Sequence, residues 1–172
     1  DVNLPQTLII NHADVKRMLL LQKSVVEGSI ALIGQCSLWA DIAERSSGEE
    51  AENAHLLLEL LTPICKSYPA EMGMTSISNG LQVLGGAGFC DDFPLQQHYR
   101  DTRINPIYEG TTAIHGMDLL GRKVPMKGGK AVMLFNSLVN ETILEANAYE
   151  ATKPFADKLA KTQEKLVQLT MS

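Results

Sequence analysis

The residues from 100 to 116 contain one carboxylate in an unusual setting. Glu109 lies between Tyr108 and Gly110, shortly after the proline-interrupted turn at Pro106. A glutamate held in a tight turn, beside a glycine that permits close approach, has the placement of a general base. The plainer interpretation, which spacing alone favours, is a carboxylate at the N-terminus of the next helix, where the helix dipole stabilises negative charge. Local sequence leaves both open.

Residues 81–89, LQVLGGAGF, are a second candidate site. A double glycine at a helix end is usually a C-cap. The segment lacks the GxGxxG pattern and follows a helix instead of a strand, so a Rossmann dinucleotide loop is not predicted. In a binding role, Gln82 would offer its amide to a ligand while Gly86 lets the ligand approach the backbone.

Composition is that of an ordinary globular domain. The 172 residues suffice for one domain with a sizeable core, 45% are hydrophobic, and the net charge is −5. That charge disfavours a nucleic-acid partner, which would be held by phosphate contacts. The densest apolar runs, RMLLLQ and HLLLELLT, are far shorter than the roughly 20 residues of a membrane span, so no span is expected.

The cysteines and histidines suggest neither a disulfide framework nor a metal site. The three cysteines are Cys36, Cys65 and Cys90, and the first two lie in apolar helical contexts typical of small buried hydrophobes. We expect a cytoplasmic protein, because no secretory leader is recognisable. The four histidines show no ligand spacing, so no metal is predicted. The opening DVNLPQTLII lacks an initiator Met, as in a mature protein that has lost it or in a piece cut from a longer protein, and both interpretations stay open at this point.

Hydrophobic periodicity predicts an all-α fold, an antiparallel up-down four-helix bundle with extra C-terminal helices. Helix breakers set the expected boundaries. Pro63 predicts a kink or a restart, Pro69 the opening of a further helix that ends at the glycines from Gly85, and Pro94 and Pro106 an irregular segment. The expected helices cover residues 12–46, 49–68, 69–85, 111–124, 131–148 and 155–172.

The joint pattern of both candidate sites resembles the C-terminal helical domain of the acyl-CoA dehydrogenase family of flavoenzymes. The segment is QVLGGAGFCDDFPLQQHYRDTRINPIYEGTTAIHG, residues 82–116, and its glycine-rich, acidic-aromatic-proline, YRDTRI and IYEGT elements follow in the family's order and spacing. The resemblance implies a lead-in at residues 1–11, the family's helical bundle at 12–124, and an additional helical tail at 125–172.

The resemblance implies a dehydrogenase that oxidises an acyl-CoA thioester to the 2-enoyl-CoA. Glu109 would be the base that removes the α-proton while the β-hydrogen leaves as hydride to N5 of FAD. The backbone N–H of Glu109 would also polarise the thioester carbonyl. Tyr108 and Gly110 would contact the substrate beside it. The pKa of Glu109 should rise when the acyl chain excludes water.

The same resemblance implies the cofactor and partner sites. Gln82, Gly85 and Gly86 would contact the ADP part of FAD across a subunit interface, and Thr111 would lie near the flavin on the base's own subunit. Ala113 and His115 replace glutamines found in many members. The stretch Arg100, Asp101 and Arg103 is expected to form a charged network that anchors the loop.

The resemblance also implies a homo-dimer or homo-tetramer that passes electrons to an electron-transfer flavoprotein or similar acceptor. Because the family's N-terminal and middle domains are not in this sequence, we expect the 172 residues alone to be inactive and largely flavin-free. The alternative is a non-catalytic interaction or scaffold module that keeps the fold without the reaction.

Overall fold

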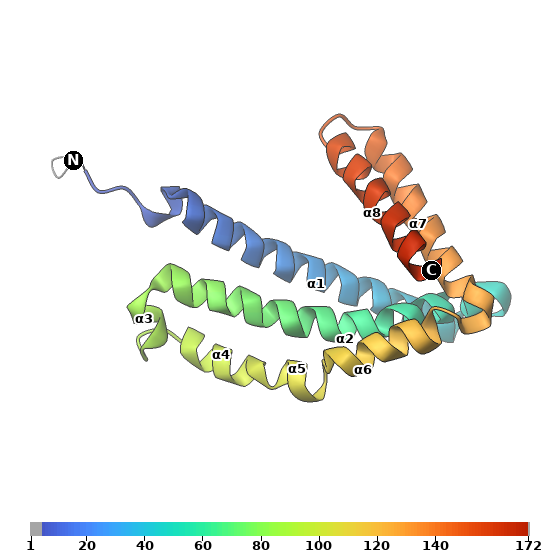
Figure 1. The fold of residues 1–172 in the computed structure, drawn as a ribbon, viewed down its shortest axis with the longest axis horizontal. Helices are drawn as coiled ribbons and strands as arrows, with labels where there is room; N and C mark the ends of the chain where they lie inside the picture. The colour runs from blue at the N-terminus through green and yellow to red at the C-terminus, as the bar shows by residue number, and fades with distance from the viewer. Residues whose placement is uncertain (1–4, 172) are drawn as a thin grey trace. The chain divides into compact units, whose positions relative to one another are not determined.

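The computed structural model describes residues 5–171, and no strand occurs among them, so the predicted all-α class is confirmed. The finer prediction of an up-down four-helix bundle stays a prediction. In chain order (Figure 1) the elements are η1 Ile9–Asn11, α1 Ala13–Arg45, α2 Gly48–Leu84, α3 Gly86–Phe89, α4 Leu95–Arg103, α5 Asn105–Tyr108, α6 Thr112–Asp118, η2 Leu119–Lys123, η3 Met126–Gly129, α7 Lys130–Asn147 and α8 Lys153–Met171.

The chain forms two compact units, and α1 and α2 contribute to both. The first unit comprises the residues up to 37 together with 63–115, and the second comprises 38–62 together with the residues from 116 onward. Both candidate sites of the sequence analysis lie in the first unit.

In the first unit, α2 lies between α1 and α4. A Cβ built on Gly80 of α2 would meet the Leu95 side chain of α4 at 2.8 Å and Oε1 of Gln22 of α1 at 3.4 Å. Farther back along α2, the position of Gly73 faces Thr102 of α4 at 3.8 Å. Residue numbers rise along α4 from Leu95 to Thr102 while those of the facing positions on α2 fall from Gly80 to Gly73, so the two helices run antiparallel (Figure 1).

Helix α2 continues through both of its prolines, so the prediction that Pro69 opens a new helix is wrong. A proline inside a helix removes one backbone hydrogen bond and costs about 3 kcal/mol or more. Packing offsets this cost at Pro63, which is fully buried. Tertiary packing therefore overrides the local breaker signal.

The segment between the glycines and Glu109 is more helical than expected. The sequence predicted an irregular segment here, and the segment indeed does not form a single helix. Two short helices, α4 and α5, nevertheless occupy most of it. Gly85 adopts a left-handed φ of 61°, which ends α2 where the double glycine predicts an end. Ile104 separates α4 from α5 while keeping helical dihedrals, so the chain bends there without becoming irregular.

The second unit has its own small core and a helical hairpin. Leu56 and Leu60 of α2 pack with Ala131 of α7, which is completely buried. Helices α7 and α8 lie side by side (Figure 1), and Nε2 of Gln163 donates to the Asn136 carbonyl at 3.1 Å.

Between α6 and η3 the chain forms a π-helical turn, η2, which the sequence did not predict. It is closed by the bond from Val124 N–H to the Leu119 carbonyl at 2.9 Å. Such turns are rare and insert an extra residue into the helical ladder. At its end, the buried Lys123 ammonium donates to the Glu59 carboxylate of α2.

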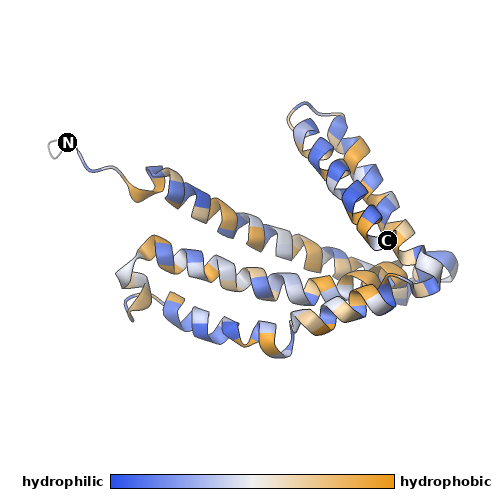
Figure 2. Ribbon diagram, in the orientation of Figure 1, coloured by the Kyte–Doolittle hydropathy of each residue, from blue (hydrophilic) through white to orange (hydrophobic). Residues whose placement is uncertain are grey.

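Helix α1 is long and apolar enough to cross a membrane, by length and composition alone. The short apolar runs in the sequence did not predict this. One such helix is weak support for a span, because core helices of water-soluble proteins pass the same test. Polar and apolar residues are interspersed along α1 (Figure 2), and Met18, Val25 and Cys36 are buried against the fold. We therefore do not treat α1 as a membrane span.

Candidate functional site

The backbone around Glu109 forms a closed turn at the end of α5. The Asn105 carbonyl accepts two hydrogen bonds, from Glu109 N–H at 3.2 Å and from Gly110 N–H at 2.7 Å. Pro106 occupies the first turn of α5, where its missing N–H costs no helical bond. The proline and the shared carbonyl together fix the direction in which Glu109 leaves the backbone.

Gly110 lets this turn lie directly on α2. The residue is buried, and a Cβ at its position would lie 2.5 Å from Cβ of Ala70 and 3.0 Å from the Lys66 carbonyl oxygen. Real Cβ atoms essentially never approach so closely. The sequence suggested that Gly110 permits the close approach of another group, and the structure shows that this group is α2.

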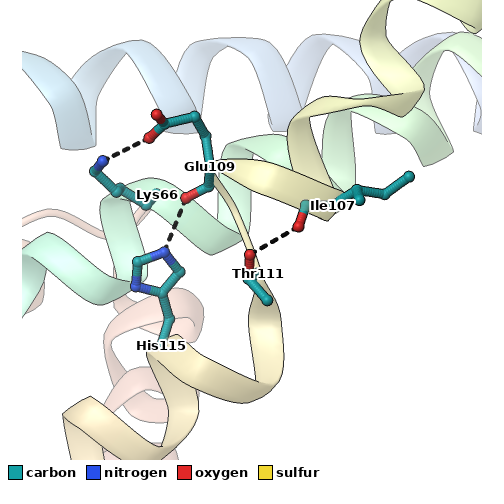
Figure 3. Close-up of polar contacts among 5 residues, drawn as sticks. All are labelled: Lys66, Ile107, Glu109, Thr111 and His115. Carbon is teal, nitrogen blue, oxygen red and sulfur yellow. Dashed lines mark hydrogen bonds and ion pairs between the residues drawn. The ribbon is translucent and has the colours of Figure 1, made fainter.

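The Glu109 carboxylate makes an ion pair with Lys66 of α2 (Figure 3). Nζ of Lys66 lies 2.7 Å from Oε2 of Glu109, and the two side chains are 48% and 57% exposed. The hydrogen bond and charge of Lys66 hold the pKa of Glu109 below its usual value, with a smaller contribution from His115. In return, Glu109 raises the pKa of Lys66.

This downward shift opposes the rise expected for a base. The expected rise depends on exclusion of water by an acyl chain, whereas the carboxylate in the structure is more than half exposed. Desolvation already acts on Glu109 in the raising direction, but the Lys66 contact outweighs it. The carboxylate is therefore ionised near neutral pH, which is the form a base requires.

Three further hydrogen bonds hold the turn, one within the connection itself and two that involve α6, of which one reaches α2. Nε2 of His115 lies 2.9 Å from the Glu109 carbonyl oxygen, and the Thr111 hydroxyl donates to the Ile107 carbonyl at 2.9 Å (Figure 3). The Thr112 hydroxyl donates to the Glu71 carboxylate of α2 at 2.5 Å. His115, which departs from the glutamine of many members, thus contacts the turn's backbone.

An open hollow adjoins the ion pair. Its volume is about 240 Å³. It is lined by Lys66, Pro69, Ala70, Asn105, Glu109 and Gly110. The carboxylate therefore lies at a concave surface where a small group can reach it.

The second candidate site lies at the far end of α2. Gln82 is exposed near the end of that helix, and nothing approaches within 4 Å of the Cβ positions of Gly85 and Gly86. At about 1.5 Å rise per residue, Gln82 is about 24 Å from Lys66 along the helix axis. The structure does not bring Gln82, Gly85 or Gly86 together with Glu109.

The substrate contact expected of Tyr108 stays a prediction, whereas the charged network expected on α4 is not found. Tyr108 is next to Glu109 but 62% exposed, with no contact that assigns it a role. The charged network expected at Arg100, Asp101 and Arg103 is wrong, because within residues 5–171 none of these three forms an ion pair. All three side chains face solvent on α4, where exposed charges gain little from pairing.

Sequence reasoning missed Lys66, which is 43 residues from Glu109. Its apolar helical surroundings carry no binding motif, and only the packing of α5 on α2 makes the two side chains neighbours. Among the residues that the structure describes, no group of three or more His, Cys, Asp or Glu side chains could hold a metal ion.

The all-helical fold agrees with a comparison to known families. The family described as "Acyl-CoA dehydrogenase, C-terminal domain" matches residues 11–124. The chain belongs to the acyl-CoA dehydrogenase family, and this region is its C-terminal helical domain.

Curated relatives share the same region. The chain is 40% identical to the 3-methylmercaptopropionyl-CoA dehydrogenase of Ruegeria pomeroyi, over 90% of this chain and 26% of that protein. It is 35% identical to a butyryl-CoA dehydrogenase of Syntrophomonas wolfei, over 88% and 25%. A broad-specificity linear acyl-CoA dehydrogenase of Mycobacterium tuberculosis is 34% identical, over 83% and 24%. The chain thus spans about a quarter of the length of these relatives.

Proposed function

We propose that the chain is the C-terminal part of an FAD-dependent acyl-CoA dehydrogenase in which Glu109 removes the α-proton of an acyl-CoA thioester. The observation that carries this proposal is the accessible Glu109 carboxylate beside the hollow on α2. A base must reach the proton that it removes, and an exposed carboxylate on a backbone fixed by Asn105 and Gly110 meets this requirement.

The backbone N–H of Glu109 would be the donor to the thioester carbonyl. The Asn105 carbonyl is bound at 2.7 Å by Gly110 N–H and only at 3.2 Å by Glu109 N–H. The longer bond can be shared with a substrate oxygen without leaving the Asn105 carbonyl unpaired. Polarisation of the thioester carbonyl makes its α-proton more acidic, so one residue would supply both the base and an electrophilic donor.

The residues assigned to FAD fit a division between two subunits. When bound, FAD supplies the acceptor for the hydride that leaves the β-carbon. Gln82, Gly85 and Gly86 present an exposed amide and an open glycine backbone, which suits close approach of the ADP part. Because these residues are about 24 Å along α2 from Lys66, they would serve a flavin other than the one near Glu109.

Thr111 would contact the flavin on the subunit that supplies the base. Its hydroxyl proton is directed to the Ile107 carbonyl, which leaves the oxygen lone pairs available as acceptors. A homo-dimer or homo-tetramer follows from this two-subunit assignment. An electron-transfer flavoprotein or a similar acceptor would reoxidise the flavin, and the unpaired cysteines are consistent with a reducing cytoplasm.

The proposal is tested in the longer flavoprotein, with the domains that precede this part in the family. Anaerobic titration with a panel of acyl-CoAs should bleach the flavin of the wild type but not of Glu109→Gln. Glu27→Gln is the matched control, because Glu27 is an exposed glutamate paired with a lysine, Lys23, on α1. The 172-residue chain alone should be colourless and inactive.

Three results would contradict parts of this proposal. Equal bleaching in Glu109→Gln and wild type would place the base elsewhere. A yellow preparation of the 172-residue chain would refute the expectation that further domains are needed for FAD. A longer protein without flavin or CoA binding would favour the non-catalytic interaction or scaffold module instead.

A further inference from the structure

Lys66 is the cationic side chain paired with the Glu109 carboxylate. The other charged or titratable group that acts on it is His115 of α6, whose ring contacts the Glu109 carbonyl oxygen. On α2, the neighbouring carboxylate of Glu71 accepts a hydrogen bond from Thr112 of the same connection. Lys66 therefore provides the main positive charge that faces this carboxylate.

The backbone of Lys66 also supports the turn that carries Glu109. The Lys66 carbonyl oxygen lies 3.0 Å from the Cβ position of Gly110, so the turn rests on the same residue whose ammonium holds the carboxylate. A lysine on a continuous helix has a fixed starting point for its side chain. The backbone positions of Lys66 and Glu109 are thus both fixed, by helix α2 and by the turn, although the two side chains are about half exposed.

We propose that Lys66 is a positioning residue for Glu109: its ammonium, on the helix that supports the turn, fixes the direction of the carboxylate for proton abstraction. This inference rests on the proposed function of Glu109 as the base. The pair is too exposed to contribute much to folding, because solvent screens its attraction. Its effect should therefore appear mainly in the titration and orientation of Glu109, with only the small change in stability that is linked to the change in its pKa.

The physical consequence follows from removal of the charge. Lys66 lowers the pKa of Glu109, so a neutral residue at position 66 allows the carboxyl to take up a proton at higher pH. The acid limb of the kcat/KM profile reports the pKa of an essential base in the free enzyme. That limb should move to higher pH without Lys66, and kcat should fall because the carboxylate is no longer held in one direction.

The test uses Lys66→Met, Lys66→Arg and a matched control, Lys23→Met. Lys23 pairs with Glu27 on α1 of the same unit, and its side chain is also exposed. In the longer flavoprotein, we expect the acid limb of kcat/KM to move up in Lys66→Met, to stay near the wild-type position in Lys66→Arg, and to be unchanged in Lys23→Met. In urea unfolding near neutral pH, Lys66→Met should lose only the small stability linked to its change in the pKa of Glu109, and the other variants should stay close to wild type. An acid limb that does not move in Lys66→Met would overturn the inference.

A second measurement separates this inference from the proposed function. In the 172-residue chain, the side-chain carboxyl of Glu109 is followed by ¹³C NMR across pH, with its signal assigned through Glu109→Gln. Its midpoint should rise in Lys66→Met, and an unchanged midpoint would refute the role of Lys66 whatever the activity. If the midpoint rises but Glu109→Gln retains full flavin reduction, Lys66 controls Glu109 while the catalytic assignment of Glu109 fails.

Discussion

Replacing Gly110 with alanine should destabilise the first unit, because the Glu109 turn lies too close to α2 for a side chain. The added Cβ would be 2.5 Å from Cβ of Ala70. That is about 1 Å short of the 3.5–4.0 Å separation at which carbon atoms attract each other most strongly. The other close atoms, the carbonyl oxygens of Lys66 at 3.0 Å and Asn105 at 3.3 Å, are backbone and cannot rotate away.

The cost follows from this geometry. Overpacking a close-packed site costs about 1–3 kcal/mol, and backbone neighbours favour the upper half of that range. Urea unfolding of the 172-residue chain, followed by far-UV circular dichroism, measures the loss as a lower denaturant midpoint at unchanged slope. The turn must move off α2 to relieve the contact, so the Lys66–Glu109 pair should weaken and the pKa of Glu109 should rise toward its ordinary value.

Two controls make this prediction specific. Gly116 lies inside α6 with nothing within 4 Å of its Cβ position, so Gly116→Ala should stabilise the chain by about 0.5–1 kcal/mol. Ala70→Gly removes one of the close atoms and should recover part of the loss when combined with Gly110→Ala. A Gly110→Ala chain as stable as wild type would show that the turn does not lie on α2 as described.

Two other predictions concern buried groups. Lys123→Met should lower the free energy of unfolding by about 2 kcal/mol in urea denaturation, because Glu59 loses its charged donor. The same contact lowers the pKa of Glu59, so the wild type should lose this contribution as pH falls below about 4.5, whereas Lys123→Met should not. Burial, and then the neighbouring Cys65, raises the pKa of Cys36 to about 11, so exposed Cys90 should react with a thiol reagent well before Cys36 at pH 8.

Local sequence predicted a helix end where it depends on the backbone conformation of a single glycine. Gly85 ends α2 because it adopts a left-handed φ, at the position where the double glycine predicted an end. This requirement is carried by a single residue, so it is visible without a fold. Pro69 was misleading as a helix start, because α2 continues through it and packing such as that around buried Pro63 is a property of the folded helix and not of its sequence neighbours.

The environment of Glu109 could be predicted only in part. Its place in the family pattern suggested a base, but the pattern says nothing of the cation that faces it. Lys66 becomes a neighbour through the contact of Gly110 with α2, and the π-helical turn at Leu119 has no local signature either. Pairings of this kind depend on which helices pack together, and periodicity identifies faces but not partners.

The position of Gly110 joins the stability of the domain to the chemistry proposed for Glu109. One short stretch of α2, from Lys66 to Ala70, supports the turn and supplies the ammonium that sets the charge of the carboxylate. A change in the packing distance therefore also changes the length of the ion pair, whereas loss of the ammonium alone leaves the packing intact. Gly110→Ala should shift the pKa of Glu109 and also lose much more stability than that shift requires, whereas Lys66→Met should lose only the small amount linked to its pKa change. A loss of stability in Lys66→Met well beyond this linked amount would show that the pair is structural and that the two effects do not separate.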